Sequence, residues 1–142
     1  MAGVWALLGA IAVVAVVAVV LRHREGRVRT AREADVELPQ PVRDLLDPGT
    51  PVTLVQISTT FCAPCRHTRV LLADLAGRTE GLRHVELDVT NRPEVAARLG
   101  VLRTPTTLAL DPGGAELLRV GGVPKRDALL AALRAYLPRP NE

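Results

Sequence analysis

An unbroken apolar segment at the N-terminus constrains this chain more than any other feature. Residues 2–21 contain no charged or strongly polar side chain, and the first charged residue is Arg22. A helix of that length is about 30 Å long, which matches the hydrocarbon thickness of a bilayer. The rest of a 142-residue chain cannot supply enough protein to bury such a helix. The segment therefore predicts a transmembrane anchor over residues 1–21.

A cleaved signal peptide is the alternative interpretation of the same segment. No basic residue precedes the apolar run, which is longer than the usual apolar core of a signal peptide. The run is followed by Arg22-His23-Arg24 and not by a small-residue cleavage site. These features favour an uncleaved, single-pass span that contacts the lipid bilayer through residues 2–21.

Arginines cluster directly after the span. No Lys or Arg precedes it, and five arginines follow within eleven residues: Arg22, Arg24, Arg27, Arg29 and Arg32. The positive-inside rule then predicts a plasma-membrane protein whose downstream domain is cytoplasmic, with an extracytoplasmic domain as the alternative. The cluster also suits anionic lipid headgroups. With a net charge of only +3 and almost no aromatic residues downstream, the chain gives no support for a nucleic-acid partner.

Hydrophobic periodicity divides the rest of the chain into a charged juxtamembrane linker over residues 22–38 and one α/β domain over residues 39–142. Val52–Ile57 is β-branched and nearly all apolar, which predicts a central strand covered on both faces. A first strand is expected near Val36–Leu38, and Asn91 is a candidate helix cap. The other expected elements are helices over residues 42–46, 64–76, 93–99 and 125–137, strands over residues 85–89, 106–110 and 115–120, and a hairpin turn over residues 111–114. Their order predicts an α/β sandwich with a mixed sheet.

The chain's two cysteines lie where the central strand turns into the first long helix, in the sequence Cys62-Ala63-Pro64-Cys65. A helix N-terminus carries about half a positive charge, and its free N–H groups stabilise an anion. A thiol held there ionises more easily and becomes a nucleophile. The two-residue spacer brings the second thiol within reach of the first. This arrangement predicts a redox-active pair.

Three other interpretations of the cysteines remain open. A structural disulfide would be unusual in the cytoplasm. A metal site would need further ligands from His23, His67 and His84, and the chain has no second paired motif. Ordinary buried thiols would not require a proline between them at the start of a helix. We expect neither a metal nor a cofactor, and we expect His67 to be a solvated helix residue.

From about residue 50 to residue 137 the chain resembles the thioredoxin family. The landmarks that carry the resemblance are the Phe61-Cys62-Ala63-Pro64-Cys65-Arg66 motif, Leu87-Asp88-Val89, the 91–100 segment, Thr104-Pro105-Thr106, the 111–114 turn, Gly121 and the closing helix. The resemblance implies a thioredoxin-like fold, in which helices flank a mixed central sheet, preceded here by one N-terminal transmembrane helix.

The resemblance also implies roles for individual residues. Cys62 would be the attacking thiolate and Cys65 the resolving thiol. Pro105 would be the cis-proline that faces the cysteines, the backbone of Thr104 would offer hydrogen bonds to the substrate, and Gly121 would leave room for it. The residues expected to contact substrate are Phe61, Ala63, Pro64, Thr104 and Gly121.

Several positions depart from the family pattern. Thioredoxins usually carry a buried Asp six residues before the first cysteine, where this chain has Gln56, and a Lys where this chain has Glu86. Phe61 and Ser58 replace two tryptophans. The buried acid of the family helps to remove the proton from the resolving cysteine. We hypothesise that Glu86 lies beneath Cys65 and accepts that proton instead; the alternative is an exposed glutamate on a strand edge.

Together these features predict a membrane-tethered thiol–disulfide oxidoreductase of the protein-disulfide reductase type. Its expected partners are disulfide-bearing proteins and an electron donor, such as a thioredoxin reductase or a membrane thiol carrier. An outward-facing domain would instead serve as an extracytoplasmic disulfide reductase or isomerase, or in cytochrome maturation. A non-enzymatic adaptor or metal-binding module is the alternative from another functional class.

Overall fold

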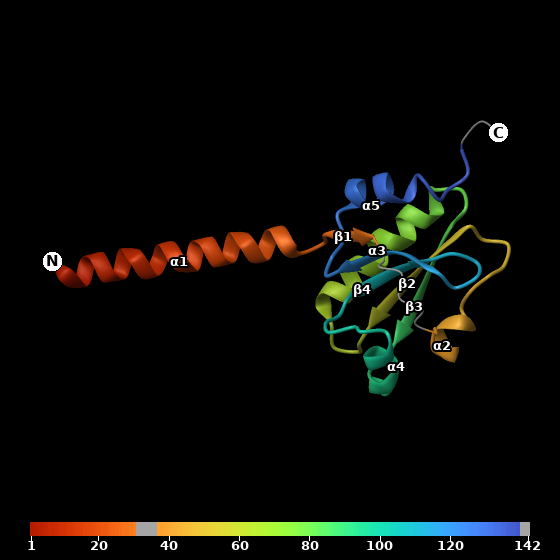
Figure 1. The fold of residues 1–142 in the computed structure, drawn as a ribbon, viewed down its shortest axis with the longest axis horizontal. Helices are drawn as coiled ribbons and strands as arrows, with labels where there is room; N and C mark the ends of the chain where they lie inside the picture. The colour runs from red at the N-terminus through yellow and green to blue at the C-terminus, as the bar shows by residue number, and fades with distance from the viewer. Residues whose placement is uncertain (31–36, 140–142) are drawn as a thin grey trace.

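A long N-terminal helix projects from an α/β domain in the computed structural model, which describes residues 1–30 and 37–139 (Figure 1). This helix, α1, covers Ala2–Arg24, and every one of its residues is exposed. A stretch of 18 residues within α1 has a mean hydropathy of 2.9. By length and composition α1 can cross a membrane, although a signal sequence at the N-terminus would meet the same criteria.

The domain is built on a five-stranded mixed sheet with the strand order β1-β5-β4-β2-β3. Only β2 and β3 run parallel; the other neighbours are antiparallel. The strands are β1 (Val28–Thr30), β2 (Val52–Ser58), β3 (Leu82–Asp88), β4 (Thr106–Leu110) and β5 (Glu116–Gly121). The predicted mixed sheet is confirmed, and β2, β3, β4 and β5 lie where the sequence pattern placed them, within a few residues.

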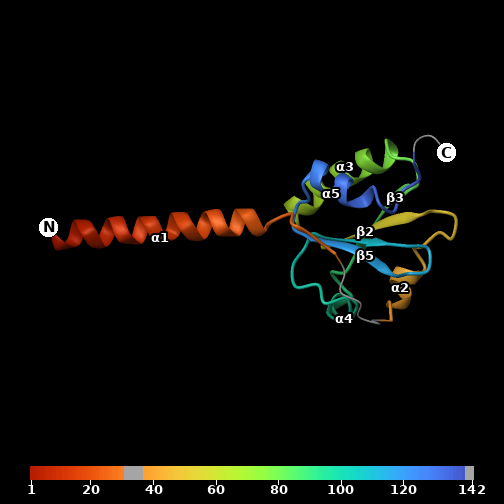
Figure 2. The ribbon, with the colours of Figure 1, turned by 45° about the horizontal axis from the view of Figure 1, so that its top comes forward.

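Strand β2 forms the centre of the core, since all seven of its residues are buried. Because successive side chains of a strand point to opposite faces, β2 contributes to two hydrophobic clusters. Val52 and Leu54 pack on the side of α3 (Ala63–Gly77) and α5 (Arg126–Leu133), while Val55 and Ile57 pack on the side of α2 (Gln40–Arg43) and α4 (Pro93–Arg98). Figure 2 shows these helices as separate layers above and below the sheet. The prediction of a strand covered on both faces is confirmed.

Within the described residues, the helices of the domain are α2 (Gln40–Arg43), α3 (Ala63–Gly77), α4 (Pro93–Arg98) and α5 (Arg126–Leu133). Three details of the predicted helices were wrong. Helix α2 covers Gln40–Arg43 and not residues 42–46, because Pro41 is tolerated in the first turn of a helix. Helix α5 ends at Leu133 and not at Leu137: the chain continues in turns, in which the Tyr136 N–H donates to the Leu133 carbonyl three residues back, and Pro138 disfavours a helical conformation at Leu137. The N-cap of α4 is Arg92, and not Asn91, because Pro93 restricts the preceding residue to a non-helical conformation.

The first strand lies inside the segment that was expected to be a linker. Residues 28–30 pair with β5 in the register Val28↔Val120, whereas Glu37 and Leu38 have no regular structure and Val36 lies outside the described residues. Strand β1 lies at the edge of the sheet and is held mainly by backbone hydrogen bonds, so it does not need an alternating apolar pattern. Its sequence, Val-Arg-Thr, has none, and hydrophobic periodicity therefore did not reveal it. The domain's sheet therefore begins only three residues after α1 ends.

Candidate active site

The two cysteines lie at the start of α3 and form a disulfide with an Sγ–Sγ distance of 2.01 Å. Cys62 is the N-cap of α3, and its sulfur accepts a hydrogen bond from the backbone N–H of Cys65 at 3.2 Å. Pro64 lies in the first turn, where a missing N–H leaves no helical hydrogen bond unmade. Cys62 is half-buried, whereas Cys65 is 1% exposed. An incoming reactant can therefore reach Cys62 but not Cys65.

The loop before β4 lies against the cysteines. The Thr104–Pro105 peptide bond is cis, and Pro105 is buried. The hydroxyl of Thr104 lies 3.8 Å from the sulfur of Cys62 and 3.3 Å from the hydroxyl of Thr59, which follows β2. The structure thus brings together Cys62, Cys65, Thr104 and Pro105 from segments about 40 residues apart in the sequence.

The space beside Gly121 is occupied by an arginine. Gly121 pairs with Thr106 next to the cis-proline, and the N–H of Gly122 donates to the carbonyl of Pro105 at 2.8 Å. A Cβ atom at Gly121 would lie 3.2 Å from Nε of Arg103. The room for substrate that the resemblance implies is therefore filled by the guanidinium of Arg103, a residue that the sequence analysis did not single out.

Exposed apolar side chains surround the disulfide. Phe61 is 99% exposed, and Ala63 and Pro64 are also exposed, so all three are available to a substrate. Leu102 is 98% exposed in the loop before the cis-proline. Leu102 was not among the predicted site residues; its signal in the sequence is an apolar residue two positions before Thr104.

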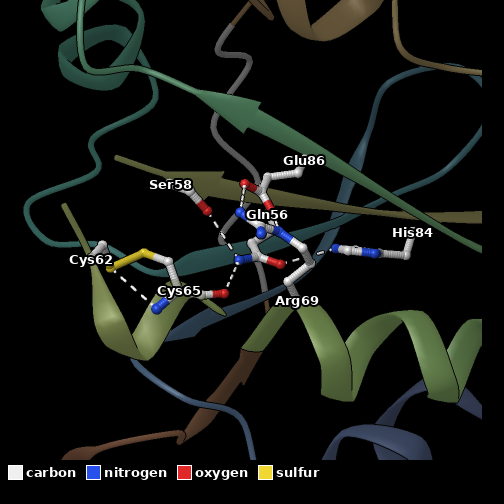
Figure 3. Close-up of polar contacts among 7 residues, drawn as sticks. All are labelled: Gln56, Ser58, Cys62, Cys65, Arg69, His84 and Glu86. Carbon is white, nitrogen blue, oxygen red and sulfur yellow. Dashed lines mark hydrogen bonds and ion pairs between the residues drawn. A yellow bond between two sulfur atoms is a disulfide. The ribbon is translucent and has the colours of Figure 1, made fainter. Parts of the chain in front are cut away.

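A buried polar network lies beneath Cys65 (Figure 3). Gln56 is fully buried, and its Nε2 donates to the carbonyl of Cys65 at 2.8 Å and to the hydroxyl of Ser58 at 3.0 Å. Its Oε1 lies 3.0 Å from Nε2 of His84. A carbonyl can only accept, so the contact with Cys65 fixes the orientation of the Gln56 amide and requires His84 to donate from Nε2.

His84 is the titratable member of this network. Burial lowers the pKa of His84 below its usual value of 6.5; the nearby Glu86 carboxylate opposes that shift and the Arg69 guanidinium adds to it. His84 was predicted only as one of the further ligands that a metal site would need. Its signal was the two-residue spacing from Glu86 on one strand, which places both side chains on the same face of the sheet.

Glu86 lies opposite Gln56 in the parallel β2–β3 pair. Its two carboxylate oxygens accept hydrogen bonds from Arg69, at 2.5 Å from Nε and 2.7 Å from Nη2, and its side chain is 22% exposed. Among the described residues, the side chain that contacts Cys65 from below is Gln56, and Glu86 makes no hydrogen bond to either cysteine. Within residues 1–30 and 37–139, no three His, Cys, Asp or Glu side chains converge as metal ligands.

Comparisons with known proteins agree with this geometry. The thioredoxin family model matches residues 42–135. The thioredoxin of Mycobacterium tuberculosis (strain H37Rv) is 34% identical over 99 residues, which cover 69% of this chain and 84% of that protein. The bifunctional thioredoxin reductase/thioredoxin of Mycobacterium leprae is 33% identical over 99 residues, which cover 69% of this chain but only 21% of that protein. A mutant thioredoxin from Halobacterium salinarum has a similar fold, with a TM-score of 0.61 and 22% identity over 77% of this chain and 98% of that one.

Proposed function

Because the chain belongs to the thioredoxin family and is a thiol–disulfide oxidoreductase with a Cys-x-x-Cys pair, we propose that it is a membrane-tethered reductase of protein disulfides. The observation that carries the proposal is the asymmetry of the pair. Cys62 is open to a reactant at the end of a helix, and Cys65 is enclosed behind it. The Cys62 sulfur can attack a substrate, whereas the Cys65 sulfur can attack only the sulfur of Cys62.

The reaction starts from the reduced pair. The Cys62 thiolate attacks one sulfur of a substrate disulfide, so a mixed disulfide forms and the other substrate sulfur leaves as a thiolate, which takes up a proton. Cys65 then loses its proton and attacks the sulfur of Cys62, which releases the second substrate thiol. The substrate gains two electrons and two protons, and the Cys62–Cys65 disulfide forms. An external dithiol donor, such as a thioredoxin reductase or a membrane thiol carrier, restores the pair.

The position of Cys62 favours its thiolate. The free N–H groups and the dipole of α3 point at the sulfur, and the N–H of Cys65 already donates to it. In the proposed complex, a substrate segment lies along the Thr104 backbone and Pro105, against Phe61 and the Ala63-Pro64 turn. Gly121 takes part once the flexible side chain of Arg103 moves aside.

We place the redox domain in the cytoplasm, with α1 in the plasma membrane. The support is the arginine cluster after α1 and the complete exposure of its apolar side chains. If the domain instead faces outward, the same cysteine chemistry serves disulfide reduction, isomerisation or cytochrome maturation in an oxidising compartment.

The proposal is tested with the full chain in detergent micelles and a disulfide-linked fluorogenic peptide, with a limiting dithiol as donor. We expect turnover by the native protein and only background reduction by Cys62→Ser. Cys65→Ser, the matched control, should accumulate a stable mixed disulfide with the peptide, because the resolving thiol is absent. Equal turnover by the native protein and Cys62→Ser would reject the enzyme and leave a binding module.

A further inference from the structure

We propose that the active site faces the bilayer, so that this protein reduces disulfides held close to the membrane surface in the membrane-proximal segments of other membrane proteins. The proposal rests on the proposed function, since it requires α1 to lie in a membrane. It adds the direction in which the catalytic sulfur points and the class of substrate that can reach it.

The connection between α1 and the domain is short. Helix α1 ends at Arg24 and β1 begins at Val28, so three residues join them. Three residues span at most about 10 Å even when fully extended. Strand β1 is in turn fixed to β5 by the register Val28↔Val120. The domain therefore has little freedom to move away from the membrane end of α1.

The connection is also packed against the domain. Gly26 is buried, with a φ of +67°, and its N–H donates to the carbonyl of Gly121 at 3.0 Å. A Cβ atom at this position would lie only 2.4 Å from the carbonyl oxygen of Val123, so the backbone fits here only as glycine. His23 and Arg24 at the end of α1 line a pocket together with residues 125 and 128 at the start of α5. The end of the span and the turn after β5 thus form one structural unit.

The same turn borders the active site. The N–H of Gly122 donates to Pro105, Gly121 pairs with the residue after that proline, and the Thr104 hydroxyl contacts the Cys62 sulfur at 3.8 Å. The contacts therefore run without interruption from the end of the span to the catalytic sulfur. Figures 1 and 2 both show the start of α3 on the side of the domain from which α1 projects.

Charge on the connecting segment supports the same orientation. Arg22, Arg24 and Arg27 are exposed at the end of α1, and Arg103 extends over Gly121 and forms a 3.9 Å ion pair with Glu25. Exposed arginines next to a span are attracted to anionic headgroups. They hold this side of the domain close to the lipid, where a large soluble protein is excluded by the bilayer and a segment of another membrane protein is not.

The orientation is tested by the depth of two fluorescent labels on the full chain in vesicles of phosphatidylcholine and phosphatidylglycerol with headgroup quenchers. One label is attached to Cys62 in a Cys65→Ser protein. The other is attached to Gly113→Cys in a protein lacking both native cysteines. Residue 113 follows β4 at the end away from Thr106.

We expect at least threefold stronger quenching at position 62 than at position 113. Insertion of 20 Gly/Ser residues between Arg24 and Glu25, a linker of about 25 Å, should abolish the difference. Equal quenching at both positions in the native chain would overturn the proposal.

The substrate class is tested by activity in the same vesicles, with one fluorogenic disulfide peptide coupled directly to a lipid headgroup and the same peptide free in solution. We expect the native chain to prefer the lipid-coupled peptide at least fivefold more strongly than the insertion variant does, while both reduce the free peptide equally. An equal preference with normal reduction of the free peptide would overturn this inference alone. A failure of both proteins to reduce the free peptide would overturn the proposed function, and the quenching result would still decide the orientation.

Discussion

At the scale of single residues, the most consequential difference from the usual family pattern is Gln56. An amide is not a base at ordinary pH, so Gln56 cannot accept the proton that Cys65 loses before it attacks Cys62. It can only hold the Cys65 carbonyl and orient His84. The titratable side chains next to it on β3 are His84 and Glu86, and their substitution separates their contributions.

Glu86 makes no hydrogen bond to either cysteine, so the hypothesis that it accepts the Cys65 proton requires transfer through a bridging water. On that hypothesis we predict that Glu86→Gln slows the resolution of the mixed disulfide by at least tenfold, because general-base assistance contributes rate factors of about 10² to 10⁴. The measurement is single-turnover release of a peptide from Cys62, followed between pH 5.5 and 9. His84→Gln is the matched control on the same strand, since it keeps a donor for Gln56 without a titratable ring. An unaltered rate of resolution in Glu86→Gln would exclude Glu86 as the proton acceptor.

His84 makes the stability of the domain dependent on pH. Burial lowers its pKa in the folded state, so between that value and 6.5 the unfolded chain binds more protons than the folded one. Stability is then fully present above pH 6.5 and decreases as the pH falls towards the folded-state pKa. Urea unfolding at pH 7.5, 6.5 and 5.5 should show this decrease in the native protein and a weaker one in His84→Gln. If a variant of the exposed His67 weakened the pH dependence of stability as much as His84→Gln does, the attribution of that dependence to His84 would be contradicted.

Removal of the Gln56 amide should destabilise the fold. Gln56→Leu leaves the buried carbonyl of Cys65 and the N–H of His84 without their partner, and each unsatisfied buried group costs about 1–3 kcal/mol. The buried hydroxyl of Thr107 provides the control, because within the part of the chain that the structure describes it has no hydrogen-bond partner. Thr107→Val should leave the free energy of unfolding unchanged or raise it. Chemical unfolding measures both, and a loss in Thr107→Val as large as that in Gln56→Leu would contradict this account.

At the scale of elements, hydrophobic periodicity and turn residues predicted the strands that pack into the core. Strand β2 is buried on both faces and β4 is followed by a turn signal, so both were located from the sequence. Strand β1 was placed wrongly because an edge strand of three residues needs no apolar pattern. At the site, the motif located Cys62 and Cys65, and the Thr104–Pro105 bond is cis as the resemblance implies. The Gln56–His84 contact arises from the parallel pairing of β2 and β3, and the placement of Arg103 arises from its contact with the turn after β5. Both are contacts between segments far apart in the sequence, so local sequence does not encode them.

The element that joins α1 to the sheet depends on one glycine. Gly26→Ala adds a Cβ that would lie 2.4 Å from a backbone oxygen and forces a left-handed conformation on an L-residue. We expect it to lower the free energy of unfolding by about 1–3 kcal/mol and to increase hydrogen exchange in β1. Gly77→Ala is the control, since the end of α3 has open space there and alanine favours a helix by up to about 1 kcal/mol. Equal stability of the two variants would contradict a packed junction.

At the scale of the whole molecule, the short junction couples the position of helix α1 to the position of the active site, and a longer linker would separate the two. A long linker would let a redox domain collect disulfides from the surrounding solution. Here only three residues separate β1 from the end of helix α1 at Arg24, and the turn that contacts Gly26 also borders the cis-proline loop. In the proposed membrane-tethered protein, the sheet would therefore fix the position of the active site relative to the bilayer, on either side of the membrane.

The side itself is predicted by the arginines that follow α1. Five arginines follow α1 and none precedes it, which predicts a cytoplasmic domain because positively charged flanks are retained on that side. A membrane-impermeant thiol reagent should therefore leave Cys62 unlabelled in intact cells and label it after permeabilisation, once the disulfide has been reduced by a permeant dithiol. Substitution of Arg22, Arg24, Arg27 and Arg29 by Gln, with Lys residues added before Trp5, should invert the result without changing the span. Labelling of the native chain in intact cells would place the domain outside the cell, where the same cysteine pair would work in an oxidising compartment.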